Sequence, residues 1–242
     1  MQACFCFHGD LSFLLRPRWR TTRQIVLPMT RAASIKDAIE AFGPPHTEIG
    51  DIVCNGRPVD FSWPVQAGQQ FDLYPVTSPW DVTRPSFLRP VPLPALAFLA
   101  DGSVGRLARL LRMAGFDTRY HPSWQASDLL DIVIREPRVL LSRNLDLLKR
   151  KQVIFGRAIR AETGLAQLRE VLALFGITEL AQALSRCLDC NAPLEPVEKT
   201  RILHRLEPLT RRYFEAFRLC RSCDRIYWAG SHVDGMRRLL FA

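Results

Sequence analysis

The sequence predicts an α/β protein of three parts: a small mixed sheet with one helix, a parallel-sheet domain, and a small module built around paired cysteines. Three observations predict this division. Five prolines fall within residues 79–94, strand and helix patterns alternate after residue 94, and two Cys-x-x-Cys pairs follow residue 186. Because proline fixes its own backbone and lacks an N–H donor, the cluster predicts a semi-rigid linker. We therefore expect domains at 1–78, 95–183 and 184–242, joined by the linker at 79–94.

Residues 1–78 have the pattern of a small mixed sheet crossed by one helix. Ser34 is placed to cap a helix that runs through Ala41, and Gly43-Pro44 is placed to end it. Asn55-Gly56 is typical of a tight turn between two strands. The strands expected are 3–7, 23–27, 52–54, 59–61 and 70–74.

Residues 95–183 alternate between short apolar runs and amphipathic runs. The runs at 95–100, 117–120, 138–142 and 152–155 predict strands, and those at 103–114, 127–135, 145–151 and 163–175 predict helices. This alternation predicts a parallel sheet with helices on both faces.

The charge is unevenly distributed along the chain. Residues 1–80 carry seven basic and seven acidic side chains, whereas residues 81–242 carry 26 basic and 17 acidic ones and so hold the whole net charge of +9. This favours an anionic partner for the C-terminal part, with nucleic acid first, although a basic surface without a specific partner has the same composition. No apolar run approaches the roughly 18 residues of a membrane span, and the N-terminus lacks the order of a signal peptide. We expect a cytoplasmic protein with no membrane partner.

Four of the seven cysteines have the spacing of a metal site. Cys187 and Cys190 form one pair, and Cys220 and Cys223 form a second. Each pair places two sulfurs on one tight turn, so two pairs supply four thiolates for a closed, structural zinc site; a redox pair or unbound thiols are the alternative. Cys4, Cys6 and Cys54 are interpreted as small buried hydrophobic residues.

Acidic residues follow the strands expected in the parallel sheet. Asp101 comes directly after the strand at 95–100, Asp146 follows the strand at 138–142, and Asp128 lies near the start of a helix. The carboxyl ends of parallel strands meet at one edge, where ligands bind. Clustered carboxylates there would bind magnesium or manganese, which activates water for phosphodiester hydrolysis. The alternative for Asp101 is a loop acid or a helix cap.

Basic residues surround these acids in the sequence. Arg106, Arg109 and Arg112 lie near one face of the helix after Asp101, and Arg143 follows the third strand of this domain. They are candidates for binding a nucleic-acid backbone. A solvated helix face is an equally good interpretation of the arginine row.

Four segments in order resemble one known family: FLADGSVGRLARLLRMAGFDT, RVLLSRNLDLLKR, RCLDCNAPLEPV and CRSCDRIYWAGSH. They are similar to the Mut-seven C-terminal ribonuclease domain, a PIN-like nuclease fold joined to a zinc ribbon. The segment SIKDAIEAFGPPHTEIGDIVCNGRPVDFSW resembles the ubiquitin-like β-grasp domain that precedes it in many bacterial members. Since the chain continues past Tyr74-Pro75 without a terminal Gly-Gly, the sequence does not favour a sulfur-carrier role. A protein partner for the β-grasp domain stays open.

The resemblance implies metal-dependent RNA cleavage, with Asp101 as the acid after the first strand. Two positions depart from the family pattern. Asn144 stands where the family usually has Asp, and Gln125-Ala126-Ser127 stand where it tends to have acids, which leaves Asp128. We expect a ribonuclease whose candidate residues are Asp101, Asp128, Asn144 and Asp146. The alternative is an RNA-binding or adaptor protein that has kept the fold and lost the chemistry.

Overall fold

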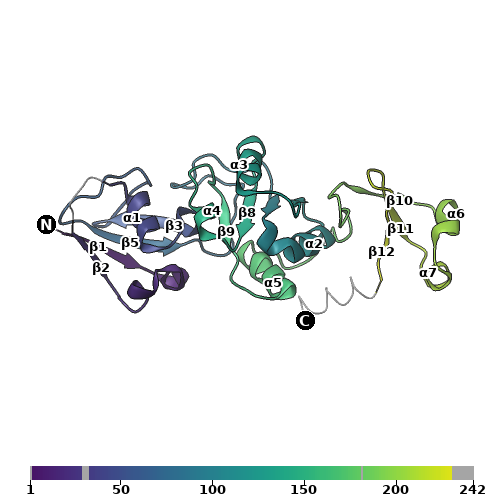
Figure 1. Cartoon of the computed structure of the whole chain (residues 1–242), viewed down its shortest axis with the longest axis horizontal. Helices are drawn as coiled ribbons and strands as arrows, with labels where there is room; N and C mark the ends of the chain where they lie inside the picture. The colour runs from purple at the N-terminus through teal and green to yellow at the C-terminus, as the bar shows by residue number, and fades with distance from the viewer. Residues whose placement is uncertain (1, 29–32, 181, 231–242) are drawn as a thin grey trace.

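The computed structural model describes residues 2–28, 33–180 and 182–230. Three parts lie in a row along the long axis of the molecule: an N-terminal domain, a parallel-sheet domain and a small antiparallel sheet (Figure 1). The predicted fold class is confirmed. No helix in the described ranges is long and apolar enough to cross a membrane.

The N-terminal domain is a five-stranded β-grasp sheet with the order β2-β1-β5-β3-β4. Its elements are β1 (Gln2–Phe7), β2 (Ile25–Pro28), β3 (Ile49–Cys54), β4 (Arg57–Pro58), β5 (Gln70–Pro75), α1 (Ile35–Phe42) and the 3-10 helices η1 (Gly9–Leu14), η2 (Pro17–Trp19) and η3 (His46–Glu48). The central pair β1 and β5 is parallel, and the other pairs are antiparallel.

Local sequence explains where α1 begins and ends. The Ser34 hydroxyl accepts a hydrogen bond from the Asp37 backbone N–H, and Gly43 follows the last turn with a φ of 138°. The predicted strand at 59–61 is wrong, because β4 ends at Pro58. There the Asp60 carboxylate accepts hydrogen bonds from the backbone N–H and hydroxyl of Ser62, which folds the chain into a turn.

The middle domain is a four-stranded parallel sheet with the order β7-β6-β8-β9. Its elements are β6 (Phe98–Ala100), η4 (Gly102–Val104), α2 (Gly105–Ala114), β7 (Thr118–Arg119), α3 (Ala126–Arg135), β8 (Val139–Ser142), α4 (Leu145–Leu148), β9 (Gly156–Ala158) and α5 (Gly164–Leu174). The predicted strand at 152–155 is wrong: pairing with β8 begins where Leu140 N–H donates to the Phe155 carbonyl, and the strand proper is β9.

Helices cover both faces of this sheet, as alternation along β6 requires. Phe98 and Ala100 pack with α2 and α5, whereas Leu99 packs with α3 and α4. The buried side chains on the Leu99 face of the sheet are continuous with the core of the N-terminal domain. The two domains therefore share buried apolar surface.

The proline-rich segment 79–94 is packed between the domains and is not an extended spacer. Trp80 stacks on Phe175, with ring centroids 5.6 Å apart. Arg89 is buried, and its guanidinium donates hydrogen bonds to the carbonyls of Ile49 and Thr47 in the N-terminal domain and of Ile154 in the parallel-sheet domain. The segment thus helps to fix the two domains together.

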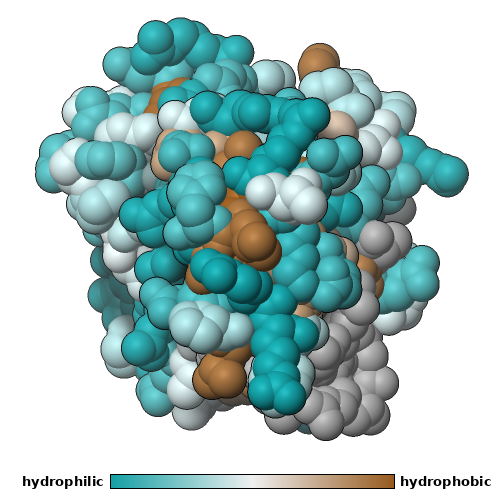
Figure 2. Space-filling model, turned by 90° about the vertical axis from the view of Figure 1, so that its right-hand side faces the viewer, coloured by the Kyte–Doolittle hydropathy of each residue, from teal (hydrophilic) through white to brown (hydrophobic). Residues whose placement is uncertain are grey.

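The C-terminal part is a three-stranded antiparallel sheet, β10 (Leu194–Val197), β11 (Phe217–Cys220) and β12 (Ile226–Trp228). Between β10 and β11, residues 198–216 form what we call the ribbon lobe, which contains α6 (Lys199–Ile202), η5 (Leu203–Arg205) and α7 (Pro208–Tyr213). Figure 2 views this end of the molecule and shows brown apolar side chains scattered among teal hydrophilic ones. Leu209 is 69% exposed in the lobe.

Both edges of the parallel sheet are covered by neighbouring parts of the chain. At β9, the Ala158 N–H donates to the buried carboxylate of Glu48 in η3. At β7, the Thr118 N–H donates to the Asn191 side chain, and Arg112 binds the Thr118 carbonyl. Because uncovered strand edges invite pairing with other chains, these contacts complete the sheet on both sides.

Candidate functional site

The strand order places a divergence of successive connections at the carboxyl edge of the parallel sheet. From β6 the chain moves to β7 on one side, and from β8 it moves to β9 on the other side. The connections therefore diverge between β6 and β8. In open parallel sheets this divergence point is where ligands bind, at the carboxyl ends of the strands.

Asp101 lies at this divergence point, and residues next to both β6 and β8 hold its carboxylate. One carboxylate oxygen accepts hydrogen bonds from the Ser103 backbone N–H, at 2.8 Å, and from the Ser103 hydroxyl. The other accepts from the hydroxyl of Ser142, the last residue of β8. Asp101 is 8% exposed, so its position is fixed by β6, η4 and β8 together. It also caps η4, as the alternative interpretation of this residue expected.

The other three candidate residues lie on helix starts. The Asn144 side-chain oxygen accepts from the backbone N–H groups of Asp146 and Leu147 and caps α4. The backbone N–H of Asn144 donates to the Ser142 hydroxyl, and that hydroxyl donates in turn to the Asp101 carboxylate. Asp146 is in the first turn of α4, where its carboxylate is 87% exposed and 3.5 Å from the Lys149 amine. Asp128 takes part in a capping box at the start of α3 and accepts from the Gln125 N–H.

The three acids do not form one multidentate metal site. Across the residues that the structure describes, the four zinc-type cysteines are the one group of three or more Cys, His, Asp or Glu side chains placed to hold a metal ion. A dedicated two-metal carboxylate cage does not fit this edge. A magnesium ion held mainly by waters and a substrate phosphate needs only one or two protein carboxylates, and Asp101 is the candidate acid whose carboxylate is fixed at this edge.

The candidate RNA-binding arginines separate into two kinds. Arg106 and Arg143 are exposed, and the guanidinium of Arg143 donates to the Ala161 carbonyl. Arg109 is 61% exposed and lies 3.6 Å from Asp189. Arg112 is a correction to the sequence interpretation: it is 3% exposed and cannot bind a nucleic-acid backbone.

Arg112 holds the first cysteine turn against the parallel sheet. Its guanidinium donates to the carbonyls of Leu188 and Asp189 in that turn and of Thr118 and Tyr120 at β7. Burial lowers the pKa of Arg112, and the neighbouring Cys187, Cys190 and Asp189 act in the opposite direction. The residue is therefore a structural tie between two parts of the molecule.

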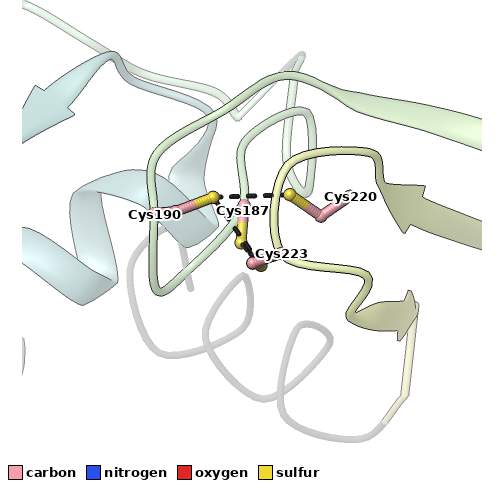
Figure 3. Close-up of side chains that lie close together, drawn as sticks. All are labelled: Cys187, Cys190, Cys220 and Cys223. Atoms are coloured by element: carbon pink, nitrogen blue, oxygen red, sulfur yellow. Dashed lines mark hydrogen bonds between the residues drawn. The ribbon is translucent and has the colours of Figure 1, made fainter.

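The four predicted zinc ligands come together (Figure 3). The sulfur of Cys190 lies 3.4 Å from that of Cys220 and 3.7 Å from that of Cys223, and Cys187 lies 3.5 Å from Cys223. All four sulfurs lie within 4.8 Å of one another. A zinc ion bonded at about 2.3 Å to four tetrahedral sulfurs spaces them by about 3.8 Å. The donor set and its spacing fit structural zinc.

Tyr227 supports this site from β12. Its hydroxyl lies 3.2 Å from the Cys187 sulfur, and burial together with that contact raises the pKa of the tyrosine. Burial disfavours the Cys187 thiolate, but backbone N–H groups of Cys190 and Asp189 and the Tyr227 hydroxyl outweigh it and lower the pKa of Cys187 to about 6. Since zinc binds thiolates, these donors favour the ligand form of the sulfur.

Ser103, Ser142 and Tyr227 are the site residues that sequence interpretation missed. Ser103 stands two residues after Asp101, and Ser142 stands at the end of an apolar strand, so both signals were local. Tyr227 stands four residues after the last cysteine. Hydroxyl residues next to a strand-end acid or a cysteine pair are the pattern that would have identified them.

Comparisons with known proteins decide the family. The model of the family described as the Mut7-C RNAse domain matches residues 96–240, and that of the Mut7-C ubiquitin matches residues 1–81. The chain belongs to the Mut7-C RNAse domain family. Among solved structures, SAMP1 from Haloferax volcanii is similar at 17% identity and a TM-score of 0.26, over 32% of this chain and 98% of that one. No curated protein matches the chain.

Family membership agrees with the resemblance drawn from the four ordered segments. The Mut7-C match spans both the parallel sheet and the antiparallel sheet with its four cysteines. The Mut7-C ubiquitin match spans the β-grasp sheet. Membership implies a ribonuclease family, and an RNA substrate follows from that family description.

Proposed function

We propose that this Mut7-C protein is a metal-dependent ribonuclease that hydrolyses RNA phosphodiesters at the carboxyl edge of the parallel sheet, with Asp101 as its metal-binding acid. The observation that carries the proposal is the position of Asp101. It lies at the point where the β6 and β8 connections diverge, and hydroxyls from η4 and β8 fix its carboxylate there.

The residues at this edge have distinct proposed roles. Asp101 holds magnesium or manganese, whose coordination is completed by waters and an RNA phosphate; when bound, the ion activates water and neutralises charge on the leaving oxygen. Arg106 and Arg143 hold the phosphate backbone. Asn144 and Asp146 lie beside this edge at the start of α4. Asp128, at the start of α3, is a further candidate catalytic acid that shares no metal with Asp101.

The second candidate is an RNA-binding or adaptor protein without cleavage activity. Asn144 favours it, because an amide brings no negative charge and its oxygen already caps α4. The separation of Asp128 and Asp146 from a common metal group favours it as well.

The metal dependence of RNA cleavage tests the proposal and separates the two candidates. Purified protein is incubated with labelled single-stranded and structured RNA over a range of manganese concentrations, with chelated samples as blanks. We expect cleavage that requires manganese. Cleavage that persists in chelator, or none at any metal concentration, contradicts the proposal.

Asn144→Asp sharpens this test. Aspartate keeps the helix cap and adds a second, charged oxygen, which contributes on the order of 1 to 4 kcal/mol to cation binding at a few ångströms. We expect the manganese concentration at half-maximal rate to fall about tenfold or more. Gln70→Glu, which adds the same charge on the exposed end of β5, is the control and should leave that concentration unchanged.

The remaining expectations belong to the same proposal. We propose a cytoplasmic location, because the four clustered cysteines can bind zinc only while they are reduced. We propose domain limits of 1–78, 95–183 and 184–242 around the segment 79–94. A protein partner for the N-terminal domain would bind a surface other than the one that Glu48 and Arg89 already use.

A further inference from the structure

A cleft of about 570 Å³ lies at the outer edge of β7, between the start of α3 and the first cysteine turn. We call it the β7 cleft; Arg119, Tyr120, His121, Trp124, Asn191 and Pro193 are among the residues that line it. Its volume is within the roughly 300–1,000 Å³ of small-ligand sites. We propose that the β7 cleft binds an unpaired nucleotide of the RNA next to the scissile phosphate. This inference rests on the proposed function, since it assigns the substrate of that site.

Two elements, β6 and α2, connect the β7 cleft to Asp101. β7 pairs directly with β6, and Tyr120 follows the last residue of β7. The Tyr120 hydroxyl occupies the space that a side chain at Gly105 would need, and Gly105 begins α2 four residues after Asp101. Tyr120 thus lines the cleft and also packs against the start of α2, so one side chain contacts both elements.

Aromatic rings give the cleft its affinity for a base. His121 lies 5.9 Å from Trp124 between ring centroids, and the Arg119 guanidinium lies 5.2 Å from the Trp124 centroid. Arginine planes and aromatic rings are the surfaces on which proteins stack unpaired bases. A base within a duplex is already stacked and paired, so this lining selects an unpaired one.

The charges place the base inside and the phosphates at the rim. Inside, Glu136 pairs with Arg119 and Arg138, and Asp117 pairs with Arg138 and Arg186. At the rim, Asp189 is shared by Arg109 and Arg225, each 61% exposed. A zinc ion with four thiolates, which adds a charge of about −2 next to the cleft, offsets part of the arginine excess. The interior is therefore close to neutral, while exposed guanidiniums outside it can bind phosphate.

Binding of a fluorescently labelled 12-nucleotide unstructured RNA, alone and as a duplex, tests the inference without cleavage. The full chain with its zinc is used, and no divalent metal is added. We expect the single strand to bind at least about tenfold more tightly than the duplex. Trp124→Ala should weaken single-strand binding by about 5- to 150-fold, the usual effect of losing one base–aromatic stack.

Matched variants keep the test decisive. Trp63→Ala removes a 40% exposed tryptophan in the N-terminal domain and should leave affinity within about twofold. Because Trp124 also packs against the core, His121→Ala, at an exposed position, serves as a milder change and should still weaken binding. Circular dichroism and zinc content confirm folding. Unchanged single-strand affinity in the folded cleft variants, or equal affinity for the duplex, overturns the inference.

The two proposals fail in different experiments. Cleavage lost in Asp101→Asn, with RNA affinity unchanged in the cleft variants, supports the nuclease and rejects the nucleotide site. Affinity lost in the cleft variants, with no metal-dependent cleavage by the wild type, supports the nucleotide site and rejects the nuclease.

Discussion

Arg109 and Arg112 lie three positions apart on α2, yet their surroundings differ completely. Arg109 is 61% exposed at the rim of the β7 cleft, whereas Arg112 is 3% exposed and binds four backbone carbonyls. Arginine suits the second position because its planar guanidinium carries five donors in a fixed arrangement. The same residue type is therefore an exposed charge at position 109 and a buried structural donor at position 112.

Replacing Arg112 should loosen the first cysteine turn. Arg112→Met keeps most of the side-chain volume but leaves the carbonyls of Leu188, Asp189, Thr118 and Tyr120 without this donor. Because unsatisfied buried polar groups cost about 1–3 kcal/mol each, we expect a loss of at least about 2 kcal/mol in the free energy of unfolding. Zinc should also pass to a colorimetric chelator faster. Arg109→Met is the control, and equal effects of the two changes would contradict this role for Arg112.

Single residues were predictable where their partners were close in sequence. The clustering of the four cysteines could be predicted because each Cys-x-x-Cys pair is local, and the position of Asp101 at a strand end because it directly follows an apolar strand. Arg112 could not be interpreted correctly, since the carbonyls it binds at Leu188 and Asp189 lie 76 and 77 positions away. Its spacing from Arg106 and Arg109 shows which helix face it shares, and carries no information about what covers that face.

The ribbon lobe lies between the two cysteine pairs and has an apolar cluster of its own. It contacts the second cysteine turn through Arg205, whose guanidinium donates to the Asp224 carboxylate. Its buried residues Ile202 and Leu206 pack with Phe217, whereas the cysteine turns pack around Leu194. β10 and β11 pair directly, with Val197 opposite Phe217, so a turn of two to five residues would be enough to join them. The lobe is thus not required to close the antiparallel sheet.

Replacing residues 199–215 with a short Asn-Gly turn should leave zinc binding intact. The four cysteines and Tyr227 are all retained, and their cluster does not include lobe residues. We expect one equivalent of zinc per chain by elemental analysis, with the four thiols protected from alkylation. Cys220→Ser in the same background is the comparison and should lose the metal. Loss of zinc from the shortened chain itself would show that the lobe supports the site.

Elements were predictable where capping and periodicity agreed. Ser34 caps its helix as expected, the helix predicted at 163–175 is present with Thr163 as its N-cap, and the alternating pattern after residue 94 correctly indicated a parallel sheet. The strand expected at 152–155 was wrong although Val153 and Phe155 are buried. Val153 is buried against the N-terminal domain, where its carbonyl contacts the His46 ring, and Phe155 is buried on the other face of the sheet beside Trp80.

At the scale of the whole molecule, Glu48 joins the N-terminal domain to the edge of the parallel sheet. Its carboxylate is fully buried, accepts from the Ala158 N–H and lies 2.7 Å from Arg157 and 3.1 Å from Arg160. Burial raises the pKa of Glu48, and both arginines and the Ala158 N–H act against that rise. No sequence pattern marked this residue, because its partners lie more than a hundred positions away.

Removing the Glu48 carboxylate should uncouple the two domains. Glu48→Ala leaves Arg157 and Arg160 without this partner, and breaking a buried ion pair costs about 3–5 kcal/mol. In calorimetry we expect the melting temperature of the parallel-sheet domain to fall and its transition to separate from that of the β-grasp domain. Glu179→Ala, which removes an exposed carboxylate after α5, should preserve the wild-type profile. A Glu48→Ala profile that matches the wild type would mean that the domains are independent.

The rate of RNA cleavage in Asp101→Asn is the most direct measurement of the central claim, which assigns metal-dependent cleavage to the edge between β6 and β8. The amide has the same shape and can keep the Ser103 contact, so folding and zinc content should not change. We expect the single-turnover rate with manganese to fall at least about 100-fold, the scale on which lost charge stabilisation acts in a site. Asp131→Asn, whose carboxylate is 66% exposed on α3, should cleave like the wild type. Equal rates for Asp101→Asn and the wild type would contradict the account.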